Sequence, residues 1–73
     1  MGPAELGNRL REVRTQRGLS QADLAGRARV SRKTINTVEN RVFVPSTVLA
    51  LRLARALETT VEELFYLTEE DSQ

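Results

Sequence analysis

The 73-residue chain contains no cysteine, no histidine and no tryptophan. Without cysteine it forms no disulfide, and without cysteine or histidine it lacks the side chains that most structural zinc sites use. We therefore expect no metal and no bound cofactor. A chain of this length buries only a small core, so helix packing and association with a second copy remain as means of stabilising it.

Long hydrophobic runs are also missing, since no stretch approaches the roughly 20 apolar residues that a membrane-spanning helix needs. No charged segment followed by an apolar stretch opens the chain, so we predict no secretory signal. Both absences favour a cytoplasmic protein without a membrane partner. The chain has no phosphate-binding loop and no cluster of inward acids, so we do not expect an enzyme.

The net charge of +1 hides an uneven distribution. Residues 1–57 carry all eleven lysines and arginines against four acids, whereas residues 58–73 carry six acids and no base. A basic body suits a polyanion such as nucleic acid, and the acidic end should point away from it. Charge alone leaves open the alternative of an ordinary solvated surface.

Apolar residues at helical spacing predict five short helices, at about residues 6–17, 21–28, 32–39, 47–57 and 61–66. Four of them follow a residue whose side-chain oxygen can cap a helix: Ser20, Ser31, Ser46 and Thr60. On the fourth helix, Val48 and Leu51 are expected to widen the buried face. The prediction is an all-α domain over residues 6–67, with a flexible lead-in at 1–5 and a disordered acidic tail at 68–73.

The predicted third helix carries no acid in its first two turns. Ile35 and Val38 fall on its inner face, and its outer positions hold Arg32, Lys33, Thr34, Asn36 and Thr37. A helix dipole favours negative charge at this end, so an anion supplied from outside would resolve the mismatch. In the major groove of DNA, Arg32 or Lys33 could donate to guanine. Asn36 could bond adenine through both atoms of its amide, and the Thr37 methyl could touch thymine.

These caps and apolar positions together resemble the lambda-repressor/Cro-like, or XRE, family of helix-turn-helix proteins. The matching residues are Leu19-Ser20-Gln21, Leu24-Ala25, Val30-Ser31, Ile35, Val38-Glu39-Asn40 and Pro45-Ser46. The resemblance covers about Leu6 to Leu67 and implies a compact five-helix domain with the helix-turn-helix at its second and third helices. Family members commonly place glycine where this chain has Arg29, Arg41 and Glu58, so these turns are either remodelled or strained.

The resemblance also implies roles for individual residues. Gln21 matches a residue that grips a phosphate, and Arg14 with Glu39 matches an ion pair that fixes the recognition helix. The positions that face base edges in the major groove are matched by Arg32, Lys33, Asn36 and Thr37. Ser31 and Thr34 match positions that touch phosphate or base. Asn40 and Arg41 match a loop that follows the DNA backbone.

Helix-turn-helix regulators usually dimerise, so that two recognition helices meet the major groove one turn, about 34 Å, apart. The apolar residues that we predict for this contact are Val42, Phe43, Val44, Phe65, Tyr66 and Leu67. Phe43 and Phe65 would alternatively complete the small core. We thus expect a transcriptional regulator, a repressor or autoregulator, that binds double-stranded DNA as a homodimer. The alternative is an antitoxin-like or adaptor module that acts mainly through protein contacts.

Overall fold

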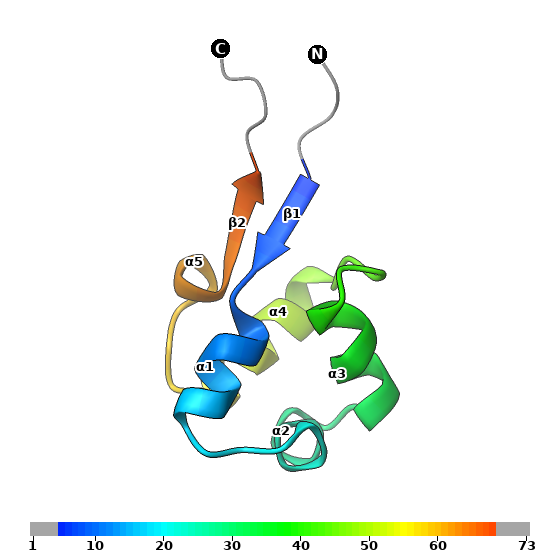
Figure 1. Ribbon diagram of the computed structural model, residues 1–73, viewed down its shortest axis with the longest axis vertical. Coiled ribbons are helices and arrows are strands. Elements are labelled where there is room, and N and C mark those ends of the chain that lie inside the picture. Colours follow the sequence, from blue (N-terminus) through cyan, green and yellow to red (C-terminus); the bar gives the residue numbers. More distant parts are fainter. Residues whose placement is uncertain (1–4, 69–73) are drawn as a thin grey trace.

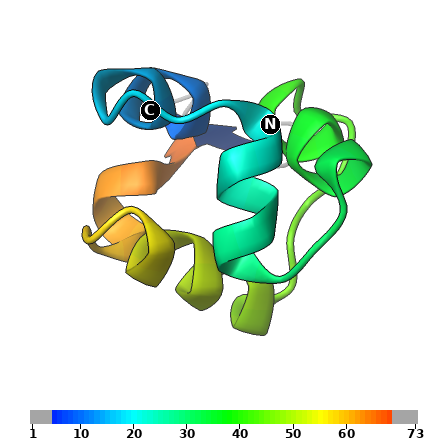
Figure 2. The same cartoon turned by 90° about the horizontal axis from the view of Figure 1, so that it is seen from below.

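The computed structural model describes residues 5–68, which form a helical body from which a two-stranded sheet extends (Figure 1). The strands are β1 (Glu5–Asn8) and β2 (Phe65–Thr68). The helices are α1 (Leu10–Gln16), α2 (Gln21–Ala28), α3 (Arg32–Glu39), α4 (Thr47–Ala56) and α5 (Val61–Leu64). Within the body, α2 packs against both α3 and α4 (Figure 2).

Helices α2 to α5 begin where the sequence predicts, because each is capped by the residue before it. The hydroxyl of Ser20 accepts the Asp23 N–H at 2.9 Å, and the Asp23 carboxylate accepts the Ser20 N–H at 2.9 Å. The hydroxyls of Ser31, Ser46 and Thr60 each accept the N–H three residues on at 3.1 Å. These bonds are local, so the sequence alone contains the information for them.

The prediction of a helix over residues 6–9 is wrong, because residues 6–8 belong to β1 and α1 begins only at Leu10. β1 pairs antiparallel with β2, which places Leu6 opposite Leu67 and Gly7 opposite Tyr66. The predicted fifth helix likewise ends at Leu64 and gives way to β2. The fold is therefore helical with one small sheet rather than purely α-helical. The pairing joins opposite ends of the chain, which local apolar spacing does not reveal.

The predicted lead-in and tail fall mostly outside the described residues. Glu5 and Thr68, which we assigned to them, are opposite each other in the sheet. Residues 1–4 and 69–73 lie outside the part of the chain that the structure describes.

The core consists of side chains from all five helices, and its fully buried members are Leu10, Leu24, Ile35, Val38, Leu53, Leu57 and Leu64. Phe65 joins them, being only 7% exposed. Val48 and Leu51, which we expected on the buried face of α4, are 59% and 56% exposed. Leu49 and Leu53 bury the opposite side of that helix, so helical geometry turns the other two outward.

The three turns without glycine keep the left-handed conformation. Arg29, Arg41 and Glu58 have φ of 62°, 62° and 57°, close to the 73° of Gly18. In each case the N–H of the next residue bonds back into the helix, as from Val42 to the Thr37 carbonyl at 3.0 Å. This bond closes a Schellman-type helix end. The chain therefore accepts the strain at these turns rather than remodelling them.

Candidate nucleic-acid interface

Helix α3 has a buried side and an exposed side. Ile35 and Val38 are fully buried, whereas Arg32, Lys33 and Asn36 are exposed. The first turn of α3 contains no acid, and the cap hydroxyl of Ser31 bonds the Thr34 N–H. The helix is therefore anchored along one side and presents basic and polar side chains on the other.

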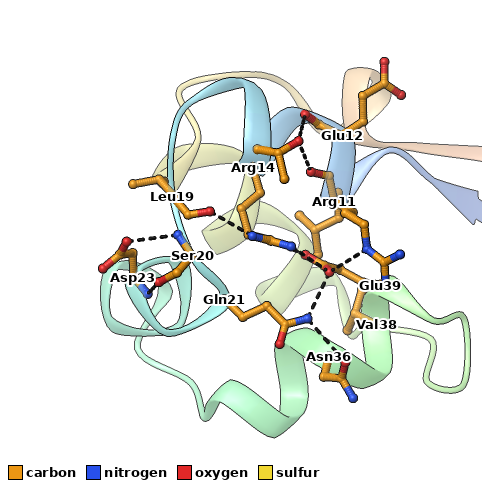
Figure 3. A network of polar contacts seen from close by, with 12 residues as sticks. Arg11, Glu12, Arg14, Leu19, Ser20, Gln21, Asp23, Asn36, Val38 and Glu39 are labelled. Carbon is orange, nitrogen blue, oxygen red and sulfur yellow. Dashed lines mark hydrogen bonds and ion pairs between the residues drawn. The ribbon is translucent and has the colours of Figure 1, made fainter.

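The predicted ion pair between Arg14 and Glu39 is confirmed (Figure 3). Nε of Arg14 lies 2.6 Å from Oε2 of Glu39, and NH2 of Arg14 lies 3.2 Å from Oε1. NH1 of the same arginine donates to the Leu19 carbonyl at 2.8 Å. One guanidinium thus ties α1 to the turn before α2 and to the end of α3.

Glu39 accepts hydrogen bonds from two further side chains. Nε2 of Gln21 lies 3.1 Å and Nε of Arg11 lies 3.3 Å from its Oε1. Burial alone would raise the pKa of Glu39, but the hydrogen bonds from Arg14, Gln21 and Arg11 outweigh burial and hold the pKa below its ordinary value. Glu39 is therefore a carboxylate at neutral pH.

These contacts continue onto the outer face of α3. Oδ1 of Asn36 accepts from Nε2 of Gln21 at 3.3 Å and from Nδ2 of Asn40 at 3.1 Å. Oδ1 of Asn40 in turn accepts from NH2 of Arg11 at 3.1 Å. We call this set the Glu39 network, and its members are Arg11, Arg14, Gln21, Asn36, Glu39 and Asn40.

Of the nine residues predicted to face DNA, Asn40 and Arg41 are exposed just after α3, and the other seven fall into two groups. A shallow hollow on the surface is lined by Gln21, Arg32, Lys33 and Asn36, which brings four of them together. The hydroxyls of the second group bond locally. Those of Ser31 and Thr34 are 2.9 Å apart, and that of Thr37 donates to the Thr34 carbonyl at 2.9 Å.

Two contributors to the position of α3 were missed from the sequence. Asn8 donates through Nδ2 to the Val38 carbonyl at 3.0 Å and accepts the Leu10 N–H at 3.1 Å, so it joins β1 to α3. Asn8 lies two residues before α1 and accepts the N–H two residues on, as in an Asx turn, and this local pattern could have been read from the sequence. Arg11, by contrast, gives no local signal, because its partners lie on α3 and at its end.

The residues predicted for a dimer contact do not all lie on the surface. Val42, Phe43 and Val44 are exposed in the loop between α3 and α4, and Tyr66 and Leu67 are exposed on β2. Phe65 is buried in the core, so its prediction as an exposed contact residue is wrong and the alternative placement is correct. Val48 and Leu51 add exposed apolar surface that was not predicted.

Along residues 5–68, no helix has both the length and the apolar character to cross a membrane. Within the same described part, no three histidine, cysteine or acidic side chains gather where they could hold a metal ion.

A family model described as a helix-turn-helix domain matches residues 5–65. An uncharacterized HTH-type transcriptional regulator of Bacillus subtilis is 36% identical over 64 residues, which cover 88% of this chain and 97% of that relative. Another, from Methanothermobacter thermautotrophicus, is 42% identical over 65 residues, covering 88% and 94%.

Two solved structures share the fold. The restriction-modification controller protein C.AhdI from Aeromonas hydrophila matches with a TM-score of 0.73 and 42% identity, over 75% of this chain and 83% of that one. A protein from Bacteroides fragilis matches with a TM-score of 0.76 at 21% identity, over 84% and 98%. The fold and the exposed basic helix define a helix-turn-helix DNA-binding domain. The chain belongs to the XRE-type, lambda-repressor-like family of helix-turn-helix transcriptional regulators.

Proposed function

We propose that the protein inserts α3 into the major groove of double-stranded DNA and regulates transcription as a sequence-specific repressor or autoregulator. The observation that carries this proposal is the division of α3. Ile35 and Val38 anchor it, while Arg32 and Lys33 extend from an acid-free first turn. An α-helix with such a face fits the major groove, where base pairs differ in their donors and acceptors.

In this proposal the residues on and around α3 have two tasks. Base edges are read by Arg32, Lys33, Asn36 and Thr37, which occupy the outer positions of α3. Phosphates are contacted by Gln21, Ser31, Thr34, Asn40 and Arg41, which stand around the ends of α2 and α3. Phosphate contacts supply affinity and register, and base contacts supply sequence preference. The task is binding without catalysis, carried out in the cytoplasm.

We further propose that the active species is a homodimer, because one α3 reads few base pairs. The exposed apolar residues Val42, Phe43 and Val44, with Leu67, supply surface for such a contact. Val48 and Leu51 on α4 supply a second exposed apolar area. The likeness to C.AhdI, which is named a controller protein, supports a regulatory role.

Selection of bound sites from a random pool of duplex DNA tests the DNA-binding proposal with the full chain. We expect a two-fold symmetric consensus with half-sites about 10 base pairs apart. Affinity for that consensus should fall as salt rises, because bound cations are released from the phosphates. Failure to enrich any sequence would contradict the proposal.

Sedimentation equilibrium tests the homodimer. The unmodified chain should reach the dimer mass, and Phe43→Asp or Leu51→Asp should shift it to the monomer, according to which apolar area forms the contact. A chain that stays monomeric both alone and on DNA contradicts the homodimer. Stable assembly with another protein in the absence of DNA would instead favour the antitoxin-like or adaptor alternative.

A further inference from the structure

Asn36 lies where the Glu39 network reaches the exposed face of α3. We infer that the network fixes the amide of Asn36 as an outward hydrogen-bond donor, so that it selects guanine over adenine. The inference rests on the proposed function, in which α3 reads base edges. It replaces the expectation that Asn36 bonds adenine through both atoms of its amide.

The first part of the argument starts from Glu39, which as a carboxylate only accepts hydrogen bonds. Gln21 must therefore turn its Nε2, rather than its oxygen, toward Oε1 of Glu39, at 3.1 Å. The same Nε2 lies 3.3 Å from Oδ1 of Asn36. Because Nε2 carries two hydrogens, it donates to both acceptors. A reversed Gln21 amide would set its oxygen against the carboxylate.

The second part starts from Arg11, whose guanidinium only donates. Its NH2 lies 3.1 Å from Oδ1 of Asn40, which fixes the orientation of the Asn40 amide. Nδ2 of Asn40 is then directed to Oδ1 of Asn36, at 3.1 Å. The Glu39 carboxylate can only accept and the Arg11 guanidinium can only donate, and they lie at the two ends of this chain of hydrogen bonds. Together they require Oδ1 of Asn36 to be an acceptor within the protein.

Both lone pairs of the Asn36 oxygen are engaged in this way, whereas no hydrogen bond from its Nδ2 is seen among the described residues. The side chain is exposed and lines the hollow with Arg32 and Lys33. The Hoogsteen edge of guanine offers two acceptors, N7 and O6, to such a donor. Adenine offers one acceptor, N7, and beside it the N6 amino group, which is a donor. The Asn36 amino group and the adenine amino group would then face each other as two donors, so no hydrogen bond could form between them.

The test compares selected binding sites of the unmodified chain and Asn36→Ala. A base position at which only Asn36→Ala loses its preference is a position that Asn36 reads. We expect guanine there, bound about tenfold more tightly than adenine, since one base hydrogen bond gives discrimination of this order. Lys33→Ala is the matched control on the same face and should leave the preference at that position unchanged.

A second pair of variants tests the cause of the preference. Gln21→Met and Asn40→Ala each remove one of the two donors to Oδ1 of Asn36, and the double variant removes both. The ratio of guanine to adenine affinity should therefore fall in each single variant and approach one in the double variant. Loss of a phosphate contact lowers both affinities alike and leaves this ratio unchanged. Circular dichroism shows which of the three variants are folded, and the ratio is measured on those.

The outcomes separate the inference from the proposed function. Adenine at the position that depends on Asn36, or no position that depends on it, overturns the inference and leaves sequence-specific binding intact. An unchanged ratio in the folded network variants also overturns the inference. Absence of any sequence preference in the unmodified chain overturns both.

Discussion

Arg14 and Glu39 form an ion pair at 2.6 Å in which the glutamate side chain is fully buried and the arginine side chain is 11% exposed. Charges withdrawn from water are unfavourable unless their remaining hydrogen-bonding capacity is satisfied. Here the Leu19 carbonyl, Gln21 and Arg11 satisfy it. Because the pair joins α1 to the end of α3, it fixes where α3 stands relative to the body.

Removal of Arg14 should destabilise the protein strongly. Arg14→Met leaves the carboxylate of Glu39 buried with weaker partners, and we expect the free energy of unfolding to fall by about 3–5 kcal/mol. Urea denaturation at neutral pH measures it. Arg17→Met is the matched control, because Arg17 and Glu58 are 4.0 Å apart and both exposed, so this change should have an effect below about 1 kcal/mol. Equal losses from the two variants would show that the buried pair does not hold the fold.

Acid should weaken the fold through Glu39. Its pKa in the folded chain lies below the ordinary value of 4.5, so the unfolded chain binds more protons as the pH falls through this region. The stabilisation is therefore present above pH 4.5 and is lost as the pH drops toward the folded pKa. Urea denaturation across this range should give a steeper loss for the unmodified chain than for Glu39→Gln.

Asp23 serves as the internal reference for that comparison. Its pKa is also lowered, first by the backbone N–H of Ser20 and then by the Ser20 hydroxyl. Its contribution is present in both chains and cancels in the difference. Parallel pH profiles for the unmodified chain and Glu39→Gln would rule out a role for Glu39 in acid sensitivity.

Lys33 should matter for DNA and not for folding, because its side chain is exposed on α3. We expect Lys33→Ala to weaken binding to the selected site by about tenfold, the scale of one base contact. Its thermal melting should stay within a few degrees of the unmodified chain. Arg52→Ala removes a cation that is also exposed, on α4, and binding by this control should change little. Equal weakening by both variants would indicate general charge attraction rather than reading by α3.

Because Glu58 stands in a left-handed turn, we expect glycine at this position to stabilise the protein relative to alanine. The φ of Glu58 is 57°, a conformation that disfavours a residue with a Cβ by roughly 1 kcal/mol. Glu58→Gly should therefore be more stable than Glu58→Ala by about this amount. Both variants lack the carboxylate, so the comparison isolates the backbone. Equal stability, measured by thermal denaturation, would show that the turn is not strained.

Local chemistry let the sequence predict the bounds of α2 and α3 and the four caps, since each cap bond spans only three residues. The resemblance further supplied the pairing of Arg14 with Glu39 and marked the turns at Arg29, Arg41 and Glu58. The rest depended on contacts between segments distant in the chain. β1 becomes a strand only because β2 lies beside it, and that pairing ends α5 at Leu64.

The same distinction applies to the candidate site. The basic character of α3 follows from Arg32 and Lys33 alone, whatever the surrounding fold. The orientation of the Asn36 amide cannot be predicted from the sequence alone, because it is set by Arg11 on α1 and by Glu39 through Gln21 on α2. The direction of the hydrogen bonds in such a network depends on the charged groups at its two ends, here Arg11 and Glu39. Only the packing of α1, α2 and α3 in the tertiary structure brings these groups together.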